Sequence, residues 1–162
     1  MQILVIFRLL ILLAVANGVP VLAKRLFGNR LSCALDGGAR FIDGCPLFGA
    51  SKTLRGLLLS IVVTTAVSPL LDLDFTSGFL VGLGAMVGDL LSSFTKRRLG
   101  IRPSGRATGL DQVPESLLPA LICWKHLSLS ALDVIGVVVV FFAGEIVLSR
   151  LMFRLHVRDR PY

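Results

Sequence analysis

Long apolar segments alternate with short charged stretches along this chain. A helix that crosses a bilayer needs about 20 mostly apolar residues, and five segments approach that requirement. The fourth is the weakest, because its apolar residues lie mainly between positions 117 and 124. We therefore predict an all-α membrane protein with about five transmembrane helices, in a single domain covering residues 1–162. The predicted helices cover residues 3–23, 57–71, 78–94, 113–132 and 132–153.

The first apolar segment has a second interpretation, as a signal peptide. A signal peptide carries a basic region before its apolar run. Here no Lys or Arg precedes the run, and Arg8 lies inside it. We therefore expect residues 3–23 to form a retained helix.

The cations are distributed unevenly and predict the topology. Fifteen of the 17 Lys and Arg residues fall in three stretches, namely the two segments that follow the first and third helices and the C-terminal end. Cytoplasmic loops of membrane proteins are enriched in Lys and Arg, so five crossings with the N-terminus outside would place all three stretches in the cytoplasm. The fifteen are Lys24, Arg25, Arg30, Arg40, Lys52 and Arg55; Lys96, Arg97, Arg98, Arg102 and Arg106; and Arg150, Arg154, Arg158 and Arg160.

Composition narrows the class of partner. The chain is 54% hydrophobic with a mean hydropathy of +0.82, which is too apolar for a soluble domain of this size, and its net charge is +7. Its basic stretches lack the interleaved aromatic residues that single-stranded nucleic acid requires. We therefore expect no nucleic acid, and instead membrane lipid or a charged small substrate.

An acidic residue leads directly from an apolar helix into a cluster of cations at residues 88–98. A carboxylate near the bilayer boundary needs a partner or a metal. On a helix, Asp89 would share a face with Ser92, Ser93 and Lys96. A second carboxylate, Asp111, lies at the far end of the loop that we predict over residues 96–112.

These two carboxylates admit two interpretations. Mg²⁺ in nucleotide sites is held by one or two carboxylates together with phosphate oxygens, so Asp89 and Asp111 could converge on one ion. Alternatively, Asp89 forms a structural ion pair with Lys96 or Arg97.

The loop before the second helix also has the composition of a phosphate site. Gly49 and Gly56 allow close backbone approach, while Lys52 and Arg55 supply charge and Thr53 a hydroxyl. The order of residues differs from a Walker loop, and no strand precedes it. We therefore predict a phosphate-binding loop of another kind.

Glycines recur in the third predicted helix at a spacing that lets helices approach closely in lipid. We interpret them as packing residues that fix the helix carrying Asp89. They are Gly78, Gly82, Gly84 and Gly88.

Several short motifs occur together over nearly the whole chain. They are Asn17-Gly18-Val19-Pro20, Asp36-Gly37-Gly38, Asp43-Gly44, Gly49-x-x-Lys52-Thr53-x-Arg55-Gly56, Gly88-Asp89, Ser93-Phe94-x-Lys96-Arg97-Arg98 and Leu110-Asp111-Gln112-x-Pro114-Glu115. In this combination the chain resembles the CDP-archaeol synthase family, which is similar to the CDP-diacylglycerol synthases. The histidine-glycine-glycine signature of the longer bacterial diacylglycerol enzymes is absent, so the chain resembles the compact branch.

The resemblance implies a CTP-dependent cytidylyltransferase that uses Mg²⁺ and acts on a lipid phosphate. It implies that Asp89 and Asp111 hold the metal, and that Lys52, Lys96 and Arg97 act with them in catalysis. The full set of candidate nucleotide-binding residues is Lys52, Thr53, Arg55, Ser92, Ser93, Lys96, Arg97, Arg98 and Gln112.

The expected reaction transfers the cytidylyl group to a lipid phosphate and releases pyrophosphate. The lipid would be 2,3-bis-O-geranylgeranylglycerol 1-phosphate or a phosphatidic-acid-like lipid, and the active site of this multi-pass protein would face the cytoplasm. The alternative is a small multispanning transporter or scaffold whose cations bind anionic lipid. The pair Asp89 and Asp111 favours the enzyme, because a lipid-binding scaffold has no use for carboxylates beside its cations. The oligomeric state stays open.

Overall fold

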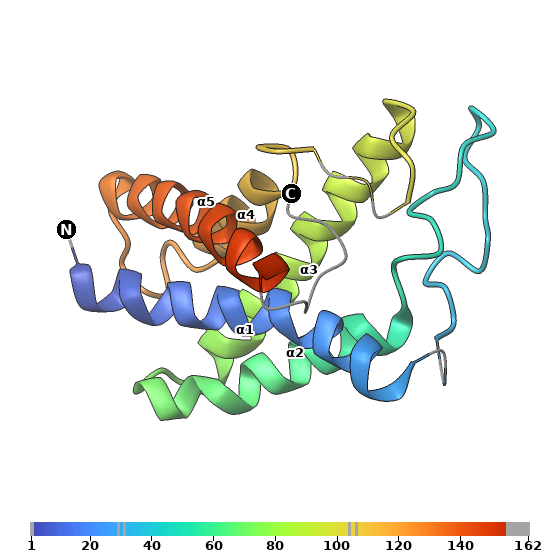
Figure 1. Ribbon diagram of the computed structural model, residues 1–162. Coiled ribbons are helices and arrows are strands. Elements are labelled where there is room, and N and C mark those ends of the chain that lie inside the picture. Colours follow the sequence, from blue (N-terminus) through green and yellow to red (C-terminus); the bar gives the residue numbers. More distant parts are fainter. Residues whose placement is uncertain (1, 29, 31, 104, 106, 155–162) are drawn as a thin grey trace.

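The computed structural model describes residues 2–28, 30, 32–103, 105 and 107–154. That part of the chain is helical, without β-strands, and contains only two isolated bridges, both in the segment between the first two helices. Figure 1 shows the helices packed side by side, with the long connecting segments at one end of the bundle. The elements are α1 (Ile3–Phe27), α2 (Leu54–Val67), the 3₁₀ helix η1 (Ser68–Leu71), α3 (Phe75–Arg98), α4 (Gln112–Ile122) and α5 (Ala131–Arg154).

Consecutive helices run in opposite directions. Ser60 of α2 donates a buried hydrogen bond of 2.7 Å to the carbonyl oxygen of Ala16 in α1. At the other end, the amide of Gln2 donates to Asp133 at 2.8 Å, which places the start of α5 beside the start of α1. The segments 28–53 and 99–111 therefore lie at the same end of the bundle (Figure 1).

Length and composition agree with an integral membrane protein. Among the described residues, α1, the continuous segment Leu54–Leu71 and α3 are long and apolar enough to cross a membrane. The prediction of an all-helical membrane protein is confirmed. Arg106, Arg158 and Arg160, which the predicted topology also used, lie outside the described residues.

Helix α4 is shorter than the predicted segment 113–132. It ends at Ile122 after 11 residues, a length of about 16 Å, which is roughly half the hydrocarbon thickness of a bilayer. The chain then leaves the helix through a series of turns, and Ser128 adopts a positive φ of 50°. The polar residues after Ile122 thus reach the far end of the bundle as a loop.

Helix α3 is longer than predicted, because it continues through the cation cluster to Arg98. Lys96, Arg97 and Arg98 therefore form its last turn, where positive charge is favourable to the helix dipole, and do not begin the loop. Asp89 consequently lies more than two turns before the helix ends.

The glycines of α3 are contact points with both neighbours. A Cβ at Gly82 would lie 3.1 Å from the Cα of Ile61 in α2. At Gly88 a Cβ would lie only 2.3 Å from the carbonyl oxygen of Pro114 in α4. The packing interpretation of these glycines agrees with this geometry, since α4 crosses α3 where no side chain fits.

We predict that Gly88→Ala lowers the melting temperature of the detergent-solubilised protein, because the methyl group pushes α4 away from α3. Overpacking of this kind costs about 1–3 kcal/mol. Gly144→Ala in α5 is the matched control, because no atom lies within 4 Å of the place that its methyl group would occupy and alanine favours helix. Equal melting temperatures for the two variants would contradict close packing at Gly88.

Candidate active site

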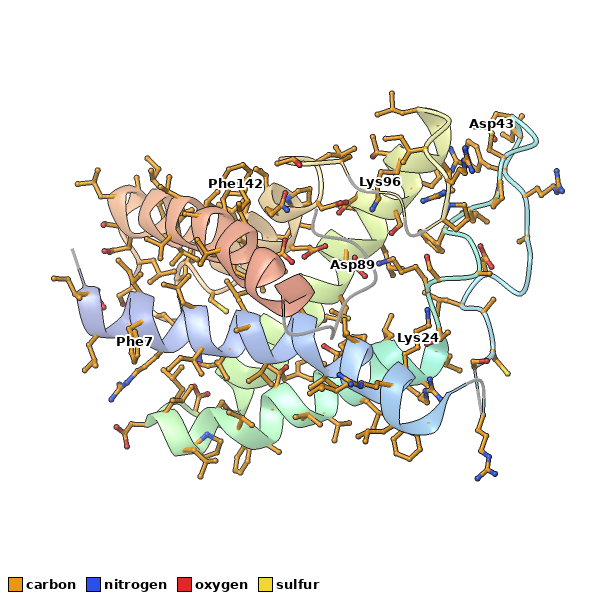
Figure 2. All side chains as sticks on the ribbon, in the orientation of Figure 1. Phe7, Lys24, Asp43, Asp89, Lys96 and Phe142 are labelled. Carbon is orange, nitrogen blue, oxygen red and sulfur yellow. The ribbon has the colours of Figure 1, made fainter. Side chains whose placement is uncertain are left out.

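Charged side chains gather at the end of the bundle that holds the two long connecting segments. In Figure 2, Lys24, Asp89 and Lys96 lie toward this end, and Phe7 lies toward the other. A cavity of about 240 Å³ opens here between the ends of α1, α2 and α3. Its lining includes Lys24, Lys52, Arg55 and Asp89.

The central contact is an ion pair between the first connecting segment and α3. The Nζ of Lys52 lies 2.5 Å from both carboxylate oxygens of Asp89. Both side chains are 22% exposed, so neither charge is fully solvated. The sequence suggested Lys96 or Arg97 as the structural partner of Asp89, but the structure supplies a lysine from a separate segment.

Backbone contacts hold Lys52 in this position. The amide of Leu35 donates to the carbonyl of Lys52 at 2.8 Å, and the amide of Leu54 donates to the carbonyl of Cys33 at 3.1 Å. Thr53 is the N-cap of α2, and its hydroxyl accepts from the amide of Gly56 at 3.1 Å. The lysine therefore sits between a short bridge and a helix start, both of which restrict the backbone.

Asp36 organises the turn that precedes Lys52. Its carboxylate accepts hydrogen bonds from the amides of Gly38, Phe48 and Gly49 at 2.9–3.0 Å. Partial burial raises the pKa of Asp36, but these backbone hydrogen bonds outweigh it and hold the pKa below its ordinary value of 3.8. Gly49 adopts a φ of +90° beside Pro103, so the same turn also touches the second connecting segment.

A second ion pair joins α3 to the end of the other connecting segment. Lys96 Nζ lies 2.7 Å from Asp111 Oδ1, with side chains 9% and 14% exposed. The other oxygen of Asp111 accepts from the amide of Ala107 at 3.1 Å. Arg97 is also buried, and it donates to the carbonyl of Ile101. Asp89 and Asp111 thus each face a lysine, and the two pairs meet α3 about two turns apart.

Three polar atoms near this second pair are buried without a hydrogen-bond partner in the described part of the chain. They are Ser93 Oγ, Arg97 Nε and Asp111 Oδ1. The last of these is close to Lys96, but the geometry of that ion pair does not make a hydrogen bond. Buried polar groups are normally satisfied, so a cluster of exceptions calls for a ligand, an ion or water.

Other predicted nucleotide-binding residues are already engaged in structural contacts. Arg98 stacks on Phe94, with its guanidinium carbon 3.7 Å from the ring centroid, and lies 3.2 Å from Asp43. Arg55 donates to the carbonyls of Gly28 and Arg30 at the end of α1. The role of either arginine toward a nucleotide stays a prediction.

The remaining polar candidates are deeply buried. Gln112 is 1% exposed, accepts from the amide of Gly109 at 2.7 Å and donates to Glu145 at 2.9 Å. Ser92, also 1% exposed, donates to the carbonyl of Gly88 within its own helix. Their roles toward a nucleotide likewise stay predictions.

Sequence reasoning did not single out three residues that the structure places at or beside this site. Lys24 lines the cavity, Asp36 orders the loop, and Glu115, 7% exposed, packs beside Gly88, next to Asp89. Asp36 and Glu115 lie in sequence motifs that the chain shares with the CDP-archaeol synthase family, and these motifs could have identified them. Among the described residues no group of three or more His, Cys, Asp or Glu is placed to hold a metal.

These features define the class of the protein: it is a helical integral membrane protein with a charged site at one end of its bundle. The chain belongs to the family described as CarS-like CDP-archaeol synthase, which it matches over residues 2–162. The family prediction is confirmed.

Individual relatives agree. The CDP-archaeol synthase of Sulfurisphaera tokodaii is 34% identical over 167 residues, covering 98% of this chain and 96% of that protein. The CDP-archaeol synthase of Saccharolobus islandicus strain L.S.2.15 is 40% identical over 113 residues, which cover 67% of this chain and 64% of that relative's length. A solved structure described as an intramembrane enzyme for archaeal membrane lipid biosynthesis is similar with a TM-score of 0.70 and 25% identity, covering 85% of this chain and 90% of that one.

We predict that Asp36→Asn destabilises the detergent-solubilised protein at neutral pH by about 1–2 kcal/mol, because the amide cannot replace a carboxylate that accepts several backbone hydrogen bonds. Since the folded pKa is lowered, the carboxylate stabilises the protein fully above the unfolded pKa near 3.9 and loses that effect as the pH falls through the lower folded value. Melting temperatures from pH 3 to 7 should therefore converge at the acid end.

Asp72→Asn is the control for this series. Its carboxylate pairs with Arg8 at 2.7 Å but is 84% exposed at the opposite end of the bundle, where such a pair contributes little, and asparagine tolerates its left-handed backbone, with φ of 51°. A loss in Asp72→Asn as large as that in Asp36→Asn would show a general charge effect and contradict the role of the turn.

Proposed function

We propose that this chain is a membrane cytidylyltransferase that converts a lipid phosphate and CTP to a CDP-activated lipid and pyrophosphate. One observation carries the proposal: in a member of this family, two lysine–aspartate pairs and a cluster of unsatisfied buried polar atoms converge on the last turns of α3. The names of the relatives support the class of reaction and favour an ether-linked archaeal lipid phosphate.

The chemistry requires no general base. A phosphomonoester is already ionised at neutral pH, and one of its oxygens attacks the α-phosphorus of CTP. The bond from that phosphorus to the oxygen that bridges to the β-phosphate breaks, and pyrophosphate leaves with the electron pair. What the protein must supply is alignment of two anions and stabilisation of developing negative charge.

The buried cations are suited to that task. Lys96 and Arg97 are 7% and 5% exposed, so their charges act in a medium that screens them less than water does. Lys52 lines the cavity and pairs with Asp89, so it can contact phosphate about two turns away from Lys96. Together these three side chains would bind and orient the triphosphate.

The residues also fit a divalent cation that the phosphates help to bind. Asp111 Oδ1 is buried and makes no hydrogen bond, although it lies 2.7 Å from Lys96, and Glu115 packs beside Gly88, next to Asp89. Asp89 and Asp111 would hold Mg²⁺, which neutralises phosphate charge when bound. The basic segments at this end of the bundle support a cytoplasmic orientation of the site.

The proposal predicts a specific activity. The purified full chain, incubated with CTP labelled in the cytidine moiety and MgCl₂, should transfer label to 2,3-bis-O-geranylgeranylglycerol 1-phosphate or to phosphatidic acid. The accompanying pyrophosphate should appear in equal amount. Binding of both lipids without any transfer of label would instead identify an anionic-lipid scaffold.

We predict that Asp89→Asn and Asp111→Asn each lower turnover by about 100-fold or more, on the order of 3 kcal/mol, because each removes a charge proposed to hold the metal. Titrating MgCl₂ should show a weakened dependence in both variants, and unchanged elution in size-exclusion chromatography would verify folding. Asp72→Asn, at the opposite end of the bundle, should retain activity. Wild-type magnesium dependence in either site variant would exclude that residue from the metal site.

A further inference from the structure

We infer that the cavity between α1, α2 and α3 receives the lipid phosphate, and that Lys24 of α1 binds its phosphate group. The inference rests on the proposed function and assigns its two substrates to two levels along α3, the lipid phosphate beside Asp89 and the triphosphate about two turns further on at Lys96. Lys24 was not among the residues that the sequence indicated.

The lining of the cavity is apolar in one part and charged in the other, which matches the hydrocarbon chains and the headgroup of a lipid. Apolar side chains from three helices form one part of the lining. Cations form the other part, at the ends of α1 and α2. The apolar part of the lining suits the start of a hydrocarbon chain, and the cations suit the phosphate group that the chain carries. The apolar residues are Pro20, Leu57, Met86 and Leu90 from the helices and Leu35 and Ala50 from the first connecting segment; the cations are Lys24, Lys52 and Arg55, and Ser32, Ser51, Thr53 and Asp89 add polar groups.

Lys24 differs from the other two cations because it has no ion-pair or hydrogen-bond partner among the residues that the structure describes. Lys52 is paired with Asp89, and Arg55 donates to backbone carbonyls at the end of α1. Lys24 forms no ion pair or hydrogen bond with any residue that the structure describes. Its ammonium group is therefore available to an anion that enters the cavity.

The cavity lies at a level that lipid can reach. The helices beside it expose apolar side chains on their outer surfaces: Leu22 of α1 is 52% exposed and Leu58 of α2 is 51% exposed. In a membrane protein such side chains contact the acyl or isoprenoid chains. A lysine at a helix end at this level can extend its ammonium group to the headgroup region while its stem stays apolar.

Asp89 connects the cavity to the proposed reaction, because this proposed metal ligand also lines the cavity. Asp89 and Lys52 line the cavity, whereas Ser93, Lys96 and Arg97 do not. A phosphate bound by Lys24 would thus face the Lys52–Asp89 pair from α1, while the triphosphate would approach from Lys96, about two turns further along the same face of α3. The attacking oxygen and the α-phosphorus would meet at Asp89.

Binding in the absence of CTP tests this assignment independently of turnover. The probe is dioctanoyl phosphatidic acid, added to the full chain in detergent, with the dissociation constant measured by isothermal titration calorimetry. Loss of a charge-assisted contact to phosphate should weaken binding by Lys24→Ala about tenfold to a hundredfold. Lys24→Arg should restore most of the affinity, and binding of CTP with MgCl₂ should be unchanged in both variants.

Arg25→Ala is the matched control. Arg25 lies next to Lys24 in the last turn of α1, is exposed and does not line the cavity. Its variant should bind the lipid as the wild type does. Equal losses in Lys24→Ala and Arg25→Ala would show a general attraction to a basic surface and overturn the inference.

Two further outcomes would also overturn it. If Lys24→Ala weakened CTP in place of the lipid, the cavity would be the nucleotide site. If glycerol 3-phosphate bound as tightly as the lipid, the apolar lining would receive no chain and the site would be one for free phosphate. By contrast, Lys24-dependent lipid binding in a protein that transfers no cytidylyl group would support the cavity assignment and refute the proposed function alone.

Discussion

The ion pair between Lys52 and Asp89 is the constraint on which the arrangement of the site depends. A carboxylate within an apolar helix is unfavourable unless a charge compensates it, and removing one member of a partly buried pair leaves the other uncompensated. The compensating lysine comes from a segment without regular helix, so other contacts must hold that segment in place for the pair to exist. The hydrogen bonds to Asp36 and the N-cap at Thr53 supply this order. The same pattern recurs at Lys96 and Asp111, where the second connecting segment closes on α3.

The sequence predicts those parts of the fold and the site that depend on neighbouring residues, and it does not predict contacts between residues far apart in the chain. Each of the five apolar segments contains a helix, and among the described residues three of these are long and apolar enough to cross a membrane, because burial in lipid acts on each segment locally. Hydropathy predicted α4 to be too long, because the residues of α4 face the glycines of α3 as well as lipid. It also predicted that α3 ends too early, because Lys and Arg lower the hydropathy of a segment although both are good helix formers. The partner of Asp89 lies 37 residues away in sequence, and no local pattern identifies a contact of that range.

Charge alone also could not separate cations that hold the fold together from those available to a ligand. Arg98 stacks on two aromatic rings and lies beside Asp43, and Arg55 closes the end of α1. Both were candidates because they sit in basic motifs. Lys24, outside those motifs, lines the cavity and forms no ion pair or hydrogen bond with the residues that the structure describes. The distinction appears only when the hydrogen bonds of each side chain are known, because a guanidinium that already donates to carbonyls must lose those bonds to reach phosphate.

The two lysine–aspartate pairs have a consequence for how an enzyme of this kind could bind highly charged substrates. Without ligand, each aspartate neutralises a lysine that would otherwise be buried and uncompensated. In the proposed reaction, a divalent cation would take over the aspartates and the phosphate groups would take over the lysines. Each aspartate would then exchange a lysine for a metal cation, and each lysine would exchange an aspartate for a phosphate group. The site would therefore bind its ligands without leaving an unpaired charge in the apolar interior. This exchange also explains why the carboxylates lie beside the cations: a basic pocket without them would have to remain solvated when empty, and the last turns of α3, where Lys96 and Arg97 are 7% and 5% exposed, leave little room for water.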